Sequence, residues 1–288
     1  MPLYVSAFPL WGKVPPKAAD EGFAFANFSS TTIAQSARLG GNVKNDKITA
    51  VIVAAGAGRR MNGPVRKQYM DISGYPVLYY TLKAFEESCV DAVIIVTAGS
   101  EQDYVRHEIV EKYGFKKVTR VCEGGRERYD SVYAGILKAD TEYIMIHDGV
   151  RMLVTPQLIN RCADVVRKTG ACVTAVPVKD TIKEAEKVQD GADAGKPVIK
   201  RTPDRANLYQ VQTPQCFRTK IILDAFEKYY SLPEESRIPV TDDSVLVETY
   251  TEQRVVVAEG DYRNIKITTI EDVGLAEYFL NNGSPTQG

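Results

Sequence analysis

The chain has 288 residues, of which 44% are hydrophobic and 25% are charged, the composition of a globular protein long enough for a large core. Its 36 basic and 37 acidic residues leave a net charge of −1, so no overall positive field favours nucleic acid and any anion site must be local. No apolar run reaches about 18 residues, which argues against a membrane span. Five scattered cysteines without a C-x-x-C pair and only two histidines argue against a zinc site, a disulfide framework or a His-rich metal centre, and they fit a reducing cytoplasm.

Residues 1–46 differ in composition from the rest of the chain: they are rich in Ala, Ser, Phe and Pro and show no hydrophobic period. No basic start leads into an apolar segment, which argues against a secretory signal, while the scarcity of acidic residues keeps an organellar transit peptide as an alternative. We expect a disordered or loosely ordered extension over 1–46, one domain over 47–281 and a tail over 282–288.

An apolar, β-branched run starting at Ile48 predicts a strand buried on both faces, as in a parallel sheet. It ends in small residues at 54–58, which let another molecule approach the main chain and let its N–H groups face an anion. Cations follow at Arg59, Arg60, Arg66 and Lys67. A loop of small residues at a strand's carboxyl end, followed by cations, indicates a polyphosphate site.

The spacing of the glycines in this loop does not match two common nucleotide-binding motifs. The third glycine of a dinucleotide fingerprint would fall at Met61, and no Gly-Lys-Ser/Thr follows Gly58, so neither a Rossmann dinucleotide site nor a P-loop is favoured. A tight strand-to-loop turn followed by solvated arginines remains the alternative.

The remaining chain alternates between strand and helix patterns. A short extended piece and turn over 69–76 comes first. Helices are predicted over 77–89, 101–113 (with His107 on its surface), 127–138, 156–169, 219–230 and 270–280, and a further helix starts at 241–244 with Thr241 as its N-cap. Strands are predicted over 90–97, 117–121, 143–146, 171–178 and 254–259. This alternation predicts an α/β fold with a mostly parallel sheet covered by helices on both faces.

Three further stretches are candidates for function. Gly124 and Gly125 lead into a helix beside arginines, which suits a second anion or base site, although a plain strand-to-helix turn has the same pattern. Asp148 ends a buried strand and would project into the crevice where open α/β sheets bind ligands; it could ligate Mg²⁺ or cap the next turn. The polar region 182–201 is typical of a projecting hairpin arm, with a solvated loop as the alternative.

The string Ala54-Ala55-Gly56-x-Gly58-x-Arg60-Met61, followed by Lys67-Gln68-Tyr69, resembles the signature loop of the 2-C-methyl-D-erythritol 4-phosphate cytidylyltransferase family. Later motifs agree with it: Gly124-Gly125-x-x-Arg128-x-x-Ser131, His147-Asp148-x-x-Arg151, Gln212-Thr213-Pro214-Gln215 and Asn264-Ile265-Lys266. The resemblance spans about 47–280. It implies a Rossmann-like three-layer sandwich, CTP and a polyol phosphate as substrates, Mg²⁺ or another divalent cation, and a homodimer joined through an arm at about 179–205.

The resemblance also implies roles for individual residues. Arg60 and Lys67 would hold the triphosphate, Lys67 and Lys266 would stabilise the transition state, and Asp148 would hold metal and substrate. The nucleotide would contact Ala54, Ala55, Gly56, Gly58, Gly124, Gly125 and Ser131. The polyol phosphate would contact Asp148, Arg151, Thr213 and Thr241, with Thr181 and Arg205 reaching it from a second subunit. Arg126 and Met152 depart from the family pattern, where some members have an acidic residue and a proline.

The reaction implied needs no activated nucleophile. A phosphate monoester has a second pKa of about 6 and is already anionic at neutral pH, so charge stabilisation is the main requirement. The low histidine content is consistent with that. Two alternatives remain open from the sequence: a ribitol 5-phosphate cytidylyltransferase, which shares the glycine loop, His-Asp and Gln-Thr-Pro-Gln, and a catalytically silent nucleotide-binding subunit.

Overall fold

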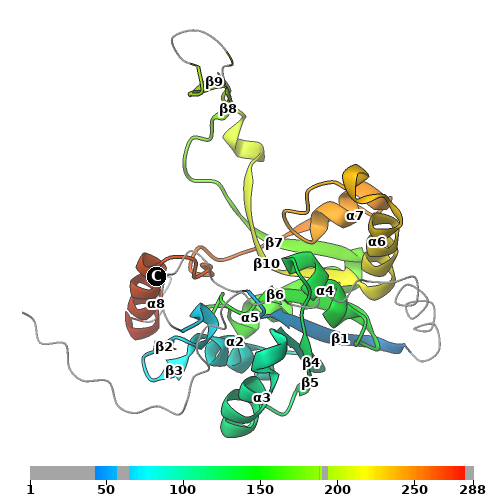
Figure 1. Ribbon diagram of the computed structural model, residues 1–288, viewed down its shortest axis with the longest axis vertical. Coiled ribbons are helices and arrows are strands. Elements are labelled where there is room, and N and C mark those ends of the chain that lie inside the picture. Colours follow the sequence, from blue (N-terminus) through cyan, green and yellow to red (C-terminus); the bar gives the residue numbers. More distant parts are fainter. Residues whose placement is uncertain (1–42, 57–64, 188, 190–193, 283–288) are drawn as a thin grey trace, which may run out of the picture.

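A seven-stranded sheet forms the centre of the computed structural model, which describes residues 43–56, 65–187, 189 and 194–282 (Figure 1). Its strand order is β11-β7-β10-β6-β1-β4-β5, and β10 alone runs antiparallel to its neighbours. The prediction of a mostly parallel sheet is confirmed. The strands are β1 (Lys44–Val53), β4 (Ala92–Thr97), β5 (Val118–Glu123), β6 (Thr141–Asp148), β7 (Ala171–Pro177), β10 (Tyr209–Arg218) and β11 (Val256–Glu259).

Helices cover both faces of the sheet, as predicted. The side chains of Ile48, Ala50 and Ile52 in β1 face α2 (Val77–Glu86) and α5 (Pro156–Thr169). Val51, between them, faces the opposite layer. That layer contains α4 (Arg128–Ile136), α6 (Thr219–Ser231) and α7 (Ser244–Tyr250). This division follows from the two-residue period of a strand, and it produces a three-layer sandwich.

The helix α5 has both of its predicted ends because its sequence carries strong end signals. The hydroxyl of Thr155 accepts a hydrogen bond from the main-chain N–H of Leu158 at 3.2 Å, and Pro156 occupies the first turn. Gly170 ends the helix with a φ of 82°, a left-handed conformation that favours glycine.

Two segments differ from their predictions. The single helix expected over 101–113 is a 3₁₀ turn η3 (Gly99–Glu101), a short α3 (Gln102–Tyr104) and a π-helix η4 (Val105–Glu111), although His107 lies on the surface as predicted. Strand β10 was not predicted as a strand, because its glutamines hide the apolar pattern of a buried strand. It is buried nevertheless, since it lies between β6 and β7.

Several short elements and one last helix complete the body of the fold. The predicted short extended piece and turn are η2 (Lys67–Tyr69), β2 (Asp71–Ile72) and β3 (Tyr75–Pro76), with Ser73 and Gly74 at positive φ in the turn. Short 3₁₀ turns lie at η5 (Arg205–Asn207) and η6 (Glu234–Ser236), and α8 (Ile270–Asn282) follows last. Among the described helices, none has the length and apolar character needed to cross a membrane.

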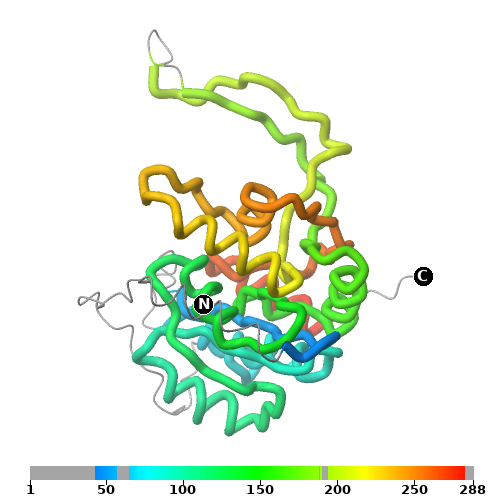
Figure 2. The backbone as a smooth tube through the Cα atoms, turned by 90° about the vertical axis from the view of Figure 1, so that its right-hand side faces the viewer, coloured from blue at the N-terminus to red at the C-terminus, as the bar shows by residue number. Residues whose placement is uncertain are grey.

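The predicted hairpin arm is present between β7 and β10. It consists of β8 (Glu184–Lys187) paired antiparallel with β9 (Pro197–Arg201). Figure 2 shows the two chain segments of the arm extending well beyond the body of the protein. Two apolar side chains of β9, Val198 and Ile199, are 40% and 61% exposed.

Close packing between α4 and the sheet gives a test of the fold. A Cβ atom at Gly135 would lie 2.5 Å from Val51 Cγ1 and 2.8 Å from Val96 Cγ2. Gly135→Ala is therefore expected to lower the free energy of unfolding by about 1–3 kcal/mol in urea denaturation, the usual cost of overpacking a core. Gly274→Ala is the matched control, because nothing lies within 4 Å of that Cβ position. In α8 the same change is expected to raise stability, by up to about 1 kcal/mol; equal effects of the two substitutions would contradict the packing described.

Candidate active site

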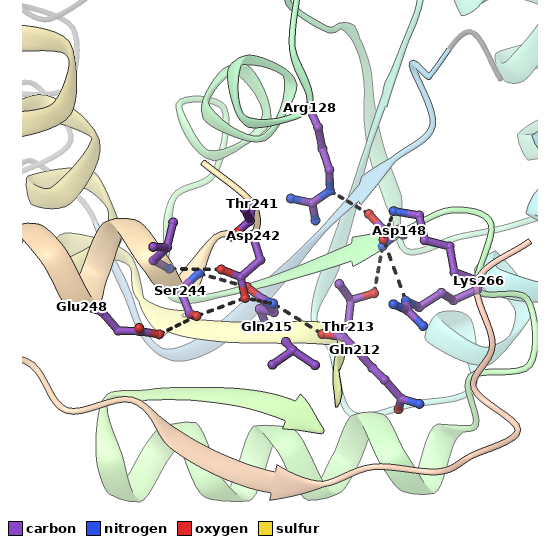
Figure 3. A pocket seen from close by; sticks show the side chains of 13 residues that line it. Arg128, Asp148, Gln212, Thr213, Gln215, Thr241, Asp242, Ser244, Glu248 and Lys266 are labelled. Atoms are coloured by element: carbon purple, nitrogen blue, oxygen red, sulfur yellow. Dashed lines mark hydrogen bonds and ion pairs between the residues drawn. The ribbon is translucent and has the colours of Figure 1, made fainter. Parts of the chain in front are cut away.

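Asp148, at the carboxyl end of β6, lies at the centre of a group of positive side chains (Figure 3). Arg128 Nε donates to its Oδ1 at 2.8 Å, and Lys266 Nζ lies 2.8 Å from its Oδ2. Arg151 Nε is 3.8 Å from the same Oδ2. The carboxylate side chain is only 8% exposed. Burial alone would raise the pKa of Asp148, but Arg128, Lys266 and Arg151 hold it well below its usual range.

Arg128 is a site residue that the sequence patterns did not predict. While its Nε binds Asp148, its Nη1 and Nη2 donate to both carboxylate oxygens of Asp243 at 2.9 Å each. Asp243 is fully buried. Burial would lower the pKa of Arg128, but the Asp243 and Asp148 carboxylates raise it, so it stays charged. The signals in the sequence were the arginines that follow Gly124 and Gly125 and the place of Arg128 inside the Gly-Gly-x-x-Arg-x-x-Ser motif, but neither assigned it a partner or a role.

The two predicted catalytic lysines come together at one segment. Lys67 Nζ donates to the main-chain carbonyl of Ile267 at 3.1 Å, and Ile267 directly follows Lys266. The side chain of Lys67 thus contacts the segment that carries Lys266, and the Lys266 side chain reaches Asp148.

The predicted nucleotide-binding residues also lie together. A Cβ at Gly124 would lie 2.6 Å from Ser131 Oγ and 2.8 Å from Ala55 Cβ, so only glycine allows this approach. The main-chain N–H of Gly125 donates to Ser131 Oγ at 3.1 Å. Ala54 continues the sheet by donating to Val96 at 2.7 Å. The predicted contacts at Gly58 and Arg60 lie outside the described residues.

A cavity of about 470 Å³ opens beside Asp148. The strand end β6 supplies one wall, β10 supplies a second, and the start of α7 a third (Figure 3). Its lining residues are Arg128, Asp148, Arg151, Val211, Gln212, Thr213, Gln215, Thr241, Asp242, Ser244, Val245, Glu248 and Lys266.

Comparison with known proteins identifies the family. The family model for 2-C-methyl-D-erythritol 4-phosphate cytidylyltransferase matches residues 48–282. The enzyme of that name from Lachnospira eligens is 45% identical over 234 residues, covering 81% of this chain and 98% of that protein. Its counterpart from Lachnoclostridium phytofermentans is 43% identical over 236 residues, covering 82% and 97%. The chain belongs to the 2-C-methyl-D-erythritol 4-phosphate cytidylyltransferase family.

A solved structure agrees with this assignment. The 4-diphosphocytidyl-2C-methyl-D-erythritol synthase of Anaerococcus prevotii matches with a TM-score of 0.69 and 33% identity, covering 82% of this chain and 98% of that one. The fold class and the family predicted from the motifs are confirmed, and the chain is a CTP-dependent nucleotidyltransferase of the cytidylyltransferase family.

In this cytidylyltransferase, Thr213 is held by a buried chain of hydrogen bonds. Its Oγ1 accepts from the main-chain N–H of Asp148 at 3.1 Å and lies 3.0 Å from His147 Nδ1, while His147 Nε2 lies 3.4 Å from the carbonyl of Arg151. Burial lowers the pKa of His147 to about 3, so the ring is neutral. Because a carbonyl can only accept, Nε2 carries the ring proton, and the Thr213 hydroxyl donates to Nδ1. His147 is therefore a structural acceptor and not a general base.

Thr241 does not cap α7, and that prediction is wrong. The N-cap position is Asp243, and the carboxylate of Asp242 accepts from the main-chain N–H of Val245 at 3.2 Å. Gln215 Oε1 anchors the same turn by accepting from the N–H groups of Asp243 and Ser244 at 3.0 Å each. Thr241 is instead an exposed residue on the cavity wall, in reach of a ligand.

Arg66 is also not a free cation for polyphosphate, contrary to its prediction from the sequence. Its side chain is 5% exposed and forms an ion pair with Glu101, which is 3% exposed. The sequence contains no sign of this pairing, because Glu101 lies in a segment with ordinary helical patterning.

The arm residues Thr181 and Arg205 lie outside the cavity of their own chain. Arg205 Nη1 donates to the main-chain carbonyl of Lys179 at 2.9 Å at the base of the arm. Of the two departures from the family pattern, Arg126 is 68% exposed, and Met152 is buried in a small cluster with Ile72, Val150 and Ile267.

Proposed function

We propose that this chain transfers the cytidylyl group of CTP to 2-C-methyl-D-erythritol 4-phosphate, giving 4-diphosphocytidyl-2-C-methyl-D-erythritol and pyrophosphate for isoprenoid precursor synthesis. The observation that carries the proposal is the convergence of Lys266, Arg128 and Arg151 on Asp148, with Lys67 bound to the adjoining main chain. The same reaction is named for its close relatives.

The chemistry follows from this charge arrangement. An oxygen of the substrate phosphate bonds to the α-phosphorus of CTP, and the bond from that phosphorus to the oxygen bridging the β-phosphorus breaks, releasing pyrophosphate. The attacking phosphate is already anionic, so no base is needed. The barrier is repulsion between anions and the charge that develops at phosphorus, which fixed cations lower.

We assign roles accordingly. Arg60 and Lys67 hold the triphosphate, and Lys67 with Lys266 stabilises the transition state. Lys266 balances Asp148 in the free protein, so an incoming phosphate has to compete with that carboxylate for it. Arg151 and Thr241 position the polyol phosphate. The Thr213 hydroxyl, which donates its proton to His147, presents a lone pair and would accept from a substrate hydroxyl.

A divalent ion fits this site on its donor chemistry. Mg²⁺ needs one or two carboxylates together with phosphate oxygens, and Asp148, kept ionised by its neighbours, would hold it. In the described part of the chain no group of three or more His, Cys, Asp and Glu side chains could hold a metal, so substrate phosphates would supply the remaining ligands. When bound, the ion supplies positive charge to the phosphate oxygens.

We propose a homodimer in which each arm reaches the partner's site. Support comes from the exposed Val198 and Ile199 on β9 and from the position of Thr181 and Arg205 outside their own cavity. Mixing a Lys266→Ala chain with an Arg205→Ala chain tests this, because the mixed dimer would regain one intact site.

The five thiols, free in the described chain, support a cytoplasmic setting.

The proposal predicts the acid limb of the pH profile. Asp148 has a pKa well below its usual range and His147 a pKa of about 3, so neither changes charge between about pH 5 and pH 8. We therefore expect kcat/KM for the polyol phosphate to fall below about pH 6 as the substrate phosphate gains a proton. The apparent pKa should equal that of the free substrate measured by ³¹P NMR. A clearly different value would assign the limb to an enzyme group.

Pyrophosphate release from CTP and Mg²⁺ with a panel of polyol phosphates tests the function itself. Turnover is expected with 2-C-methyl-D-erythritol 4-phosphate and at least about 100-fold lower kcat/KM with ribitol 5-phosphate, because a site built for given hydroxyls discriminates strongly. Preference for ribitol 5-phosphate, or CTP binding without any turnover, would overturn the proposal.

A further inference from the structure

Side chains from the segment that follows the nucleotide loop hold residues 54–56, which come directly after the end of β1. Gln68 Nε2 donates to the carbonyl of Ala54 at 2.7 Å and to that of Gly56 at 3.3 Å. Arg66 Nη1 donates to the carbonyl between them, that of Ala55, at 3.3 Å. Successive carbonyls of an extended chain point to opposite edges, so Gln68 holds one edge of this segment and Arg66 holds the other.

Buried residues hold Arg66 and the turn η2 in place. Arg66 forms a buried ion pair with Glu101. The second oxygen of Glu101 accepts from Tyr69 Oη at 2.9 Å and from Thr97 Oγ1 at 3.2 Å. Glu101, Tyr69 and Thr97 are at most 3% exposed. Glu101 therefore fixes the turn η2 from both of its ends, through Arg66 and Tyr69.

Lys67 lies between Arg66 and Gln68 in the sequence, but its side chain points elsewhere. Arg66 and Gln68 point to the end of β1, while Lys67 Nζ points to the carbonyl of Ile267. Neither Arg66 nor Gln68 lines the cavity beside Asp148. Any shift of this turn would move Lys67 and the main chain at Ala54–Gly56 together, and both belong to the proposed triphosphate site.

We propose that Arg66, Gln68 and Glu101 are positioning residues that set the affinity for the triphosphate of CTP, by holding the end of β1 and the Lys67 turn in one arrangement. The inference rests on the proposed nucleotide site. It assigns to buried side chains, away from the reacting atoms, a share of the binding of a nucleoside triphosphate.

Gln68→Met tests the proposal, because methionine keeps the length of the side chain but donates no hydrogen bond. Without the two hydrogen bonds from Gln68, residues 54–56 are no longer held in the binding arrangement, and the Kd of CTP, measured by calorimetry without polyol phosphate, is expected to rise by roughly 10- to 30-fold. The inhibition constant of pyrophosphate should rise by a similar factor. The KM of the polyol phosphate at saturating CTP should change by less than about 2-fold.

Thr219→Val is the matched control. It removes a buried hydrogen bond from Thr219 Oγ1 to the carbonyl of Thr141 at 2.6 Å, at the amino end of β6, and should leave the Kd of CTP unchanged. Glu101→Gln, which keeps the shape but removes the charge opposite Arg66, should act in the same direction as Gln68→Met and serves if that variant fails to fold. A folded variant of either kind with a Kd within 2-fold of the unchanged protein overturns the proposal. Because the readout is binding, it is separate from a failure of wild-type turnover, which would overturn the function instead.

Discussion

Replacing Lys266 by alanine is expected to lower kcat at saturating CTP by roughly 10²–10³-fold, the usual effect of removing one preorganised group that stabilises transition-state charge. Lys266 Nζ already lies 2.8 Å from Asp148 in the free protein, so its position is set before substrate binds. The fold should survive, because Arg128 and Arg151 still balance the Asp148 carboxylate. Steady-state pyrophosphate release measures the effect.

Lys220→Ala is the control for this substitution. Lys220 is also paired with a carboxylate, that of Asp224 at 2.8 Å, but it lies on the exposed surface of α6. Its removal should leave kcat within about 2-fold of the unchanged protein, since an exposed pair contributes little. Wild-type turnover in Lys266→Ala would show that this ammonium does not act on the reaction.

Asp148→Asn is expected to have an effect of similar size, on the order of 10³-fold in kcat, for a different reason. The amide keeps the shape of the side chain but removes the negative charge that faces Arg128, Arg151 and Lys266. We expect the Mg²⁺ concentration for half-maximal activity to rise as well, because a neutral amide is a poor ligand for a hard cation.

The metal dependence separates the two substitutions. Lys266→Ala should lower kcat with little change in the Mg²⁺ requirement, whereas Asp148→Asn should change both. Asp140→Asn serves as the control, because Asp140 pairs with Lys44 on the surface, away from the cavity. An unchanged Mg²⁺ requirement in Asp148→Asn would remove this residue from the proposed metal site.

Much of the site could be predicted from the sequence because its residues stand in short motifs. Asp148 follows a buried strand, and Lys67 follows a glycine loop, so local patterns locate both at the carboxyl edge of the sheet. Contacts between distant segments could not be predicted in this way. The pair of Arg128 with Asp243 joins residues 115 positions apart, and nothing local marks either as its partner.

The predictions that were wrong or missed have the same cause, which is a contact with a residue far away in the sequence. Arg66 looks like a phosphate ligand in the sequence because it follows two other arginines, yet its side chain forms a buried ion pair with Glu101. Strand β10 escaped prediction because Gln212 and Gln215 are buried polar residues, whose partners lie on the α7 turn and near Asn264. In each case the tertiary partner decides the role, and periodicity does not reveal it.

A crystal structure of the protein with CTP and Mg²⁺ would test the proposed site most directly. We predict that the triphosphate lies along the end of β1, with its oxygens in contact with Lys67 and with the ion bound to Asp148. Finding the α-, β- and γ-phosphates far from both residues would contradict the assignment of this carboxylate and its surrounding cations as the place where the two substrates react.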